Sequence, residues 1–314
     1  RTMVNDLINN PPYLKKGSLV GITCPSGYVS EDRVSFAAET LKLWGFEVMI
    51  GKTVGNEHHY FSGTDEERAE DLQAMLDNPD MDAILMGRGG YGLSRIIDRL
   101  DWSKFKLNPK WICGFSDITV LHNHIHNNLQ IPTMHSPMCG SFTPDTINSG
   151  HIKRFLASLI GESQHYHTEP FELNRMGTSD GILTGGNLAI LSHLVGSSSD
   201  INTDGKILFI EDIGEHLYKV DRMMLTLKRA GKLDNLRGLV VGGFTEMEDT
   251  DRPFGKTVEE IIYDLVAEYD YPVCFHFPAG HIEENHTITL GMVHKLNVTR
   301  QGAHLELIKD INLA

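Results

Sequence analysis

The chain has 314 residues, which is long enough for two domains with separate cores. Its 42 acidic and 28 basic residues give a net charge of -14, which would repel a long phosphate backbone, so no nucleic-acid partner is expected. No apolar run approaches the roughly 20 residues of a membrane-spanning helix, so no membrane partner is expected either.

The first half of the chain alternates short apolar runs with amphipathic segments. The predicted strands span 19–24, 46–50 and 83–86, and the predicted helices span 31–44, 65–76 and 92–100. Thr64 and Glu67 form a capping box at the start of the second helix. This alternation predicts an α/β domain whose parallel sheet is covered by helices, with ligands bound beyond the carboxyl ends of the strands.

A glycine-rich motif, GRGGYG at 87–92, follows the third predicted strand. Its backbone N–H groups are suited to an anion, which is either a phosphate or the oxyanion of an acyl-transfer reaction. No Lys-Ser/Thr follows and the spacing is not GxGxxG, so the phosphate interpretation is the weaker of the two. A purely structural turn is the third interpretation.

Ser116 lies where an apolar strand at 111–115 gives way to a helical pattern beginning at Asp117. On such a turn the hydroxyl is either a nucleophile raised above the sheet or a cap for free helix N–H groups. The local pattern is G-x-S-x-I, which lacks the second glycine of the usual nucleophile elbow. The stretch alone therefore leaves both roles open.

The alternation lapses between 141 and 176, where a polar loop, one helix at 151–160 and an irregular segment are expected. We predict an N-terminal α/β domain at 1–145, a linker region at 146–175 and a smaller, mixed α/β domain at 176–314. In that last domain a glycine turn leads into a helix within 181–196, and short β segments follow from 287. Its other predicted strands span 206–212, 237–244 and 271–277, and its other predicted helices span 216–230 and 258–269.

Two residues of the second half are candidates to complete a site with Ser116. Glu211 ends the apolar strand ILFIE, and His281 follows Pro-Ala-Gly after another apolar run. Taken singly, each residue is more often an ordinary capping or surface side chain. Spacing alone does not separate them from nearby alternatives, which are Glu215, His276 and His286.

Cysteine and histidine spacing argues against disulfides and metals. The cysteines lie far apart beside apolar residues, and we interpret them as four buried thiols in a reducing compartment, Cys24, Cys113, Cys139 and Cys274. This favours a cytoplasmic location, although a removed export signal would leave no trace. Among His122, His124 and His126 only the first and last share a helix face, and no HExxH motif occurs, so neither a metal nor another cofactor is expected.

Five stretches together resemble the LD-carboxypeptidase family of serine peptidases, which includes murein tetrapeptide carboxypeptidases and microcin C self-immunity proteins. They occur in the family's order over most of the chain. They are GRGGYG (87–92), GFSDIT (114–119), GGNL (185–188), IEDIGEHLYKVDRM (210–223) and PAGHIEENHTITLG (278–291).

The resemblance implies a catalytic triad of Ser116, His281 and Glu211, in which the imidazole takes the serine proton and the carboxylate orients it. It also implies an oxyanion hole made by backbone N–H groups, those of Asp117 and of Gly89 or Gly90. The nucleophile would lie in the N-terminal domain and the acid and base in the C-terminal domain. The site would then be at their junction, usually in a homodimer.

The implied reaction releases terminal D-alanine from muropeptides by cleaving the bond after an L-configured centre, commonly that of diaminopimelate. A carboxypeptidase must hold the free carboxylate of its substrate, and Arg88 is a candidate by charge. The glycine-rich motifs complete the expected substrate-binding set, Arg88, Tyr91, Gly186 and Asn187.

Two alternatives differ from this prediction. The first is a microcin-type amidase that hydrolyses acyl-nucleotide toxins; that branch carries an aromatic insertion, whereas 168–183 here is short and has no tryptophan. The second is a two-domain protein that binds a small anionic or sugar ligand without chemistry. It predicts that Glu211 and His281 are too far apart for a hydrogen bond.

Overall fold

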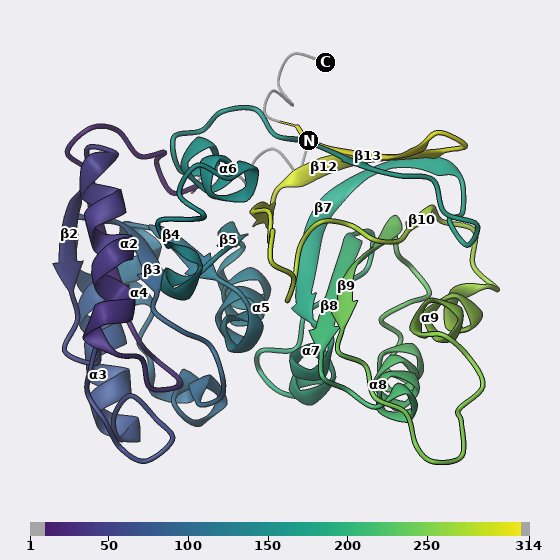
Figure 1. Cartoon of the computed structure of the whole chain (residues 1–314), viewed down its shortest axis with the longest axis horizontal. Helices are drawn as coiled ribbons and strands as arrows, with labels where there is room; N and C mark the ends of the chain where they lie inside the picture. Colours follow the sequence, from purple (N-terminus) through teal and green to yellow (C-terminus); the bar gives the residue numbers. More distant parts are fainter. Residues whose placement is uncertain (1–9, 309–314) are drawn as a thin grey trace.

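Two β-sheets, one in each half of the chain, lie side by side and carry helices on their faces (Figure 1). The computed structural model describes residues 10–308. Within this range no helix is long and apolar enough to cross a membrane. The α/β fold predicted from the sequence is confirmed.

The first sheet has the strand order β11-β5-β4-β3-β1-β2. Its strands are β1 (Leu19–Thr23), β2 (Glu47–Ile50), β3 (Met81–Met86), β4 (Trp111–Gly114), β5 (Thr133–His135) and β11 (Ile288–Leu290). The five strands from the first half are parallel, as their alternation with helices predicts. Their carboxyl ends therefore meet at one edge, where ligands bind in such sheets.

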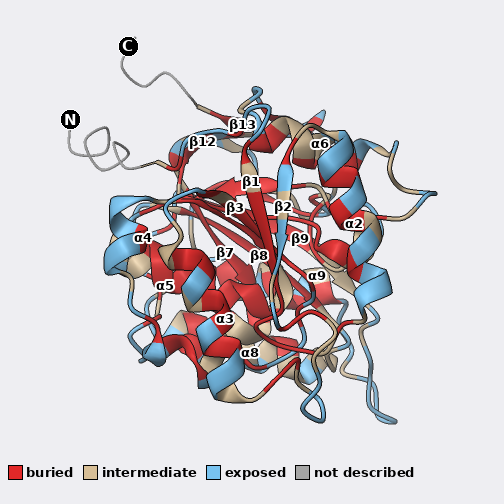
Figure 2. Cartoon of the chain, turned by 90° about the vertical axis from the view of Figure 1, so that its left-hand side faces the viewer, coloured by how far each residue is buried: buried red, intermediate tan, exposed pale blue. Residues whose placement is uncertain are grey.

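Alternate residues of β3 and β4 enter two different cores, one on each face of this sheet. Leu85 and Trp111 pack with helices α2 (Glu31–Leu43) and α6 (Gly150–Leu159). Ile84 and Ile112 pack with α3 (Asp65–Asp77), α4 (Ser103–Leu107) and α5 (Thr119–Leu129). Figure 2 shows the buried strands between helices whose outer faces are exposed.

The second sheet has the strand order β10-β9-β8-β7-β12-β13-β6, parallel from β7 to β10 and antiparallel beyond β7. Its strands are β6 (His165–Thr168), β7 (Gly177–Asn187), β8 (Ile207–Ile213), β9 (Gly238–Thr245), β10 (Val273–Cys274), β12 (Val293–Thr299) and β13 (Gly302–Leu307). Three helices share one core with its parallel strands, α7 (Leu188–Leu194), α8 (Leu217–Arg229) and α9 (Val258–Val266).

Strand β11 joins the two halves of the molecule. It comes from the C-terminal part of the chain but pairs antiparallel with β5 of the first sheet, with Ile288 opposite His135. Because β5 is the neighbour of β4, the loop that precedes β11 is held beside the turn that follows β4. This pairing brings the segment containing His281 to the segment containing Ser116.

The helix predicted at 92–100 is wrong. The segment forms two short 3₁₀ helices, Leu93–Arg95 and Ile97–Arg99, although its apolar residues are buried as the periodicity predicts. Its first turn is fixed by a tertiary contact, since the Leu93 N–H donates to the Asp117 carboxylate (3.0 Å). Tertiary contacts of this kind override local helix propensity.

Several short or polar elements were missed. Strand β7 begins in polar, glycine-rich sequence that favours a turn, but pairing with β8 and β12 on both sides holds it extended. Strand β6 lies in the segment expected to be irregular, with Tyr166 and Thr168 buried. The helix predicted at 151–160 is confirmed as α6, and its Phe155 lies in the first core. The other unpredicted elements are α4 and β5, and the strand expected at 271–277 is confined to β10.

Candidate active site

Ser116 occupies a sharp turn between β4 and α5. Phe115 is extended, whereas Ser116 has φ +64°, a left-handed conformation that costs a non-glycine residue of the order of 1–3 kcal/mol. The capping alternative is wrong for Ser116, since no side-chain cap forms at the start of the following helices. The strained turn holds the hydroxyl at the edge where the parallel strands end.

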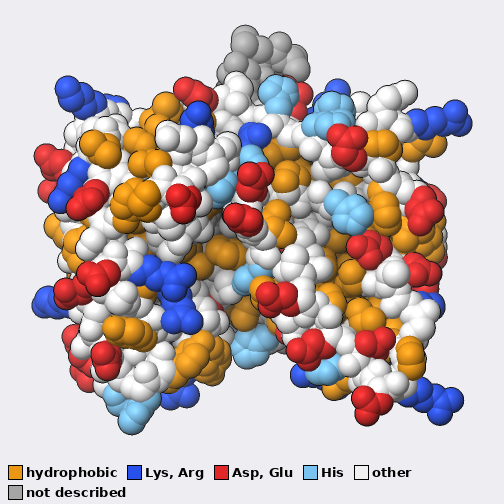
Figure 3. All heavy atoms as spheres, viewed as in Figure 1, with side chains coloured by type: hydrophobic (Ala, Val, Ile, Leu, Met, Phe, Trp, Pro, Cys, Tyr) orange, Lys and Arg blue, Asp and Glu red, His pale blue; other side chains and the backbone are white. Residues whose placement is uncertain are grey.

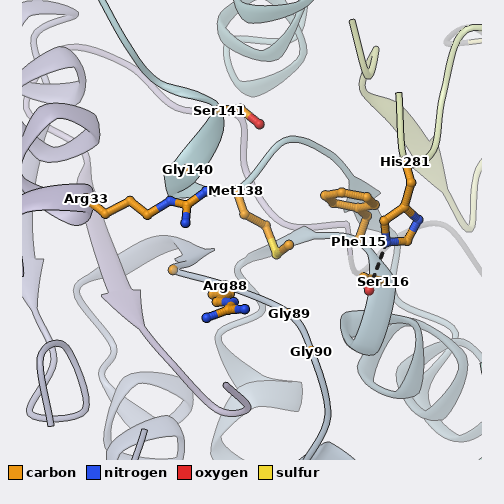
Figure 4. A pocket seen from close by; sticks show the side chains of 11 residues that line it. Arg33, Arg88, Gly89, Gly90, Phe115, Ser116, Met138, Gly140, Ser141 and His281 are labelled. Atoms are coloured by element: carbon orange, nitrogen blue, oxygen red, sulfur yellow. Dashed lines mark hydrogen bonds between the residues drawn. The ribbon is translucent and has the colours of Figure 1, made fainter. Parts of the chain in front are cut away.

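Ser116, His281 and Glu211 form one hydrogen-bonded series (Figure 4 shows the first pair). The His281 Nδ1 lies 2.6 Å from Glu211 Oε2, and the His281 Nε2 lies 3.2 Å from Ser116 Oγ. A carboxylate only accepts hydrogen bonds, so Nδ1 carries the proton and Nε2 is left to accept from the serine hydroxyl. This is the arrangement that a general base needs to activate a hydroxyl.

Burial and charge act in opposite directions on this imidazole. Burial lowers the pKa of His281, but the hydrogen bond and negative charge of Glu211 outweigh it, so the net pKa is raised above the usual value. Glu211 is fully buried near the carboxyl end of β8, and its Oε2 also accepts the backbone N–H of His281 (3.3 Å). The carboxylate thus fixes both the position and the protonated nitrogen of the ring.

The turn before His281 is shaped to bring it against Glu211. Gly280 has φ +118°, and a Cβ there would lie 2.8 Å from Glu211 Cβ. The Gly280 N–H donates to Asn285 Oδ1 (2.8 Å), and Thr245 Oγ1 donates to the His281 carbonyl (2.8 Å). Only a residue without a side chain fits at 280 without moving the carboxylate.

Replacing Gly280 by alanine is therefore expected to lower activity more than stability alone explains. The matched control is Gly255→Ala, because Gly255 has φ +90° with nothing within 4 Å of a Cβ and so carries only the backbone cost. We expect both variants to melt at lower temperatures than the wild type. Only Gly280→Ala should also lose at least about tenfold in kcat, because its methyl group displaces the Glu211 carboxylate. Equal kcat values for the two variants would contradict this role of the turn.

The alternatives that the sequence left open lie elsewhere. The His276 Nε2 contacts Glu259 (3.1 Å), and the His286 Nδ1 accepts from Arg154 (2.9 Å). Glu215 is in the loop after β8 and has no hydrogen bond or ion pair to His281 among the described residues. The structure brings Glu211 and His281, and not these residues, to Ser116.

The GRGG backbone passes beside Ser116. A Cβ at Gly89 would lie 3.1 Å from Ser116 Cβ, and the Gly89 carbonyl is held by the Gly27 N–H (3.0 Å). Among residues 10–308, neither Gly89 nor Gly90 donates its N–H to a protein acceptor. The Asp117 side chain accepts from Ser26 Oγ (2.6 Å), which anchors the other side of the turn. Burial raises the pKa of this carboxyl, against those hydrogen bonds.

A pocket of about 430 Å³ opens over Ser116 and His281. It is lined by Arg33, Gly87, Arg88, Gly89, Gly90, Phe115, Ser116, Met138, Gly140, Ser141 and His281. Arg33, Met138 and Ser141 were not predicted from the sequence. A signal existed only for Arg33, because a basic residue in the first turn of a helix opposes the helix dipole.

Tyr91, Gly186 and Asn187 do not line this pocket. Tyr91 is half exposed and packs on Phe61. A Cβ at Gly186 would lie 2.6 Å from Thr119 Oγ1, so glycine is required where β7 meets α5. The contacts that the structure shows for Tyr91 and Gly186 are packing contacts, and their predicted role in substrate binding stays a prediction.

The Asn187 side chain contacts the Glu211 carboxylate. It caps α7 by accepting from the Ile190 N–H (3.1 Å), and its Nδ2 lies 3.4 Å from Glu211 Oε1 and 3.2 Å from Asp212 Oδ1. Burial, together with the charge of Glu211, raises the pKa of Asp212 to about 6. Asn187 therefore lies between two buried carboxyl groups and donates to both.

The predicted buried thiols are confirmed: all four cysteines are free and buried, and burial raises the pKa of Cys24 and Cys274 to about 12. The histidines of α5 are also buried, and burial lowers the pKa of His122 to about 4. In the described part of the chain no group of three or more His, Cys, Asp or Glu side chains is arranged to hold a metal ion.

Two family sequence models match the chain in its two halves. The LD-carboxypeptidase N-terminal domain matches residues 20–136, and the LD-carboxypeptidase C-terminal domain matches residues 180–296. The chain is 33% identical over 303 residues to a probable murein peptide carboxypeptidase of Bacillus subtilis (strain 168), covering 94% of each protein. It is 28% identical over 275 residues to the murein tetrapeptide carboxypeptidase of Pseudomonas aeruginosa, covering 85% of this chain and 89% of that protein.

Solved structures show the same fold. The muramoyltetrapeptide carboxypeptidase from Oxalobacter formigenes superposes with a TM-score of 0.84 at 29% identity, covering 93% of this chain and 99% of that one. The wild-type apo structure of the microcin C7 self immunity protein MccF has a TM-score of 0.83 at 22% identity, covering 95% and 98%. At that identity the second likeness concerns the fold alone.

Proposed function

The chain belongs to the LD-carboxypeptidase family, and from this premise we propose that it is a serine carboxypeptidase that releases terminal D-alanine from murein tetrapeptides. The observation that carries the serine mechanism is the series of hydrogen bonds from Ser116 through His281 to Glu211, with the serine in a left-handed turn at the pocket. The tetrapeptide substrate is supported by the curated relatives.

In the proposed reaction, Ser116 Oγ attacks the carbonyl carbon of the L,D-peptide bond while His281 Nε2 takes its proton. The oxyanion that forms is held by backbone N–H groups, for which we propose Asp117 and Gly89 or Gly90. The tetrahedral intermediate collapses as the protonated imidazole gives its proton to the nitrogen of the leaving D-alanine. Water, deprotonated by His281, then hydrolyses the acyl-enzyme and frees the serine.

No metal takes part in these steps. Glu211 remains ionised throughout, and its charge stabilises the imidazolium that exists while the proton is carried. The proposal also includes a cytoplasmic homodimer, for which the support is the family resemblance and the buried, unpaired thiols. Light scattering of the purified protein measures that oligomeric state directly.

The substrate is tested with peptides that differ at one centre. We expect D-alanine release from L-Ala-γ-D-Glu-diaminopimelyl-D-Ala, and at least about a hundredfold lower kcat/KM when the terminal residue is L-alanine, since a misplaced reacting group is costly. An acyl-sulfamoyl nucleotide is assayed in parallel. Hydrolysis of the nucleotide without release of D-alanine would replace the peptide substrate by the microcin-type one.

The pH dependence of activity and of stability should have opposite signs. His281 must be neutral to act as a base, so kcat/KM is expected to rise with pH through an apparent pKa above the usual value of about 6.5. A raised folded-state pKa stabilises the fold fully below about pH 6.5, and this contribution is lost as pH rises through the folded pKa. Activity profiles and thermal melts of wild type and His281→Gln, measured over the same pH range, test both trends.

A further inference from the structure

The pocket over Ser116 contains two guanidinium groups and no acidic side chain among its lining residues. Arg88 Nη1 donates to the Tyr28 carbonyl (2.7 Å), whereas the Arg33 guanidinium has neither an ion pair nor a hydrogen bond to any residue between 10 and 308. The chain as a whole has 14 more acidic than basic residues, so counter-ions are abundant elsewhere. An unpaired guanidinium in a concave site is suited to an anionic ligand.

The two arginines occupy different places in the pocket. Arg88 is adjacent to Gly89, whose Cβ position lies 3.1 Å from Ser116 Cβ. Arg33 comes from α2, and Figure 4 shows it at the end of the pocket opposite Ser116 and His281, with Met138 between them. Figure 3 shows basic side chains grouped on the N-terminal half, beside the hollow between the two halves.

The surroundings of the Arg33 side chain are a glycine and the first turn of α2. Gly140 packs directly under its side chain: a Cβ there would lie 2.8 Å from Arg33 Nε and 2.9 Å from Nη2. The backbone at Gly140 does not have a positive φ, so a Cβ there would cause no backbone strain and would only require the Arg33 guanidinium to shift. Arg33 also sits in the first turn of α2 beside Glu31 and Asp32, where the helix dipole disfavours a cation.

We propose that Arg33 binds a second carboxylate of the substrate, on the acyl side of the scissile bond, and so selects peptides that carry this carboxylate. This inference rests on the proposed carboxypeptidase function. The leaving group is a single D-alanine, whose carboxylate is only a few bonds from the carbon attacked by Ser116 and therefore stays at the Ser116 end of the pocket. A cation at the far end of the pocket can meet only a carboxylate more distant along the peptide.

The murein tetrapeptide offers two such carboxylates, one at the end of the diaminopimelate side chain and one on the D-glutamyl residue. Three peptides distinguish them: the parent, a form with L-lysine in place of diaminopimelate, and a form with D-isoglutamine in place of D-glutamate. The measurement is kcat/KM of wild type and Arg33→Gln on each peptide. The wild type alone, on the parent peptide, reports the proposed function.

The expected result is a loss of about ten- to hundredfold in Arg33→Gln on the parent and on one of the two modified peptides. On the other modified peptide, which lacks the carboxylate that Arg33 binds, wild type and variant should be equal within about twofold. An equal loss on all three peptides, or no loss on any, would overturn the proposal. No D-alanine release by the wild type would overturn the carboxypeptidase function itself, and this inference with it.

Two further variants separate position from charge. Gly140→Ala keeps the guanidinium but displaces it, so it should show the same peptide-dependent loss as Arg33→Gln. Arg300→Gln removes the same charge from the exposed turn between β12 and β13 and should leave all three kcat/KM values unchanged. Thermal melts should show all variants folded, since Arg33 is exposed and makes no ion pair among the described residues.

Discussion

Replacing Ser116 by alanine is expected to lower kcat for tetrapeptide hydrolysis by about 10⁴- to 10⁶-fold. The hydroxyl is the group that forms the acyl-enzyme in the proposed reaction, and its only hydrogen bond among the described residues is to the His281 Nε2. Burial, packing and the GRGG backbone are unchanged by the substitution. The measurement is D-alanine released per enzyme, with the assay extended to the detection limit.

A second substitution at the same position separates fold from chemistry. Alanine retains the strained left-handed turn, whereas Ser116→Gly relieves it and is expected to be more stable than Ser116→Ala by about 1 kcal/mol. Both variants should be equally inactive. If Ser116→Ala kept more than a few per cent of wild-type activity, Ser116 would not be the nucleophile.

Replacing Glu211 by glutamine is expected to lower kcat by about 10⁴-fold. The Nδ1 of His281 and its backbone N–H both donate to the same atom, Glu211 Oε2. A glutamine there either presents its NH₂ to both of these donors or turns the NH₂ toward Asn187 Nδ2, which is also a donor, and in either orientation the negative charge is lost. The imidazole then loses the tautomer that leaves Nε2 free to accept a proton. The loss therefore arises although Ser116 and His281 are both present.

The control for this variant is Glu215→Gln, which changes an acid four residues away that has no contact with His281 among the described residues. Its kcat should equal that of the wild type. The pH at which the residual activity of Glu211→Gln falls on the acid side should also be lower than in the wild type. The reason is that Glu211 raises the pKa of His281, whereas burial lowers it. A loss below tenfold in Glu211→Gln, or a larger loss in Glu215→Gln, would contradict the assignment.

Helices and strands with a clear local pattern of apolar residues could be predicted from the sequence. The strand-to-turn-to-helix change at Ser116 and the strand that carries Glu211 follow from local apolar patterns, and both are observed, although the strand continues to Ile213. Strand β7 could not be predicted because its glycine-rich sequence has no strand propensity and is held by its neighbours. The 3₁₀ turns after Gly92 likewise depend on the contact between Leu93 and Asp117.

The site residues are far apart in the sequence and come into contact only through the tertiary fold. His281 is 70 residues from Glu211 and 165 from Ser116, and their contacts depend on β11 pairing with β5. No local pattern separates Glu211 from Glu215, so the selection of residues came from the family resemblance. Arg33 was missed because its one sequence signal, a cation in the first turn of a helix, does not indicate which pocket the side chain enters.

The most direct test of the central claim is D-alanine release from the murein tetrapeptide with a chelator present, by wild type and Ser116→Ala side by side. We expect the chelator to leave the wild-type rate unchanged and the Ser116→Ala rate to be lower by at least about 10⁴-fold. Release that stops with the chelator, or that persists without the Ser116 hydroxyl, would contradict a metal-independent serine mechanism.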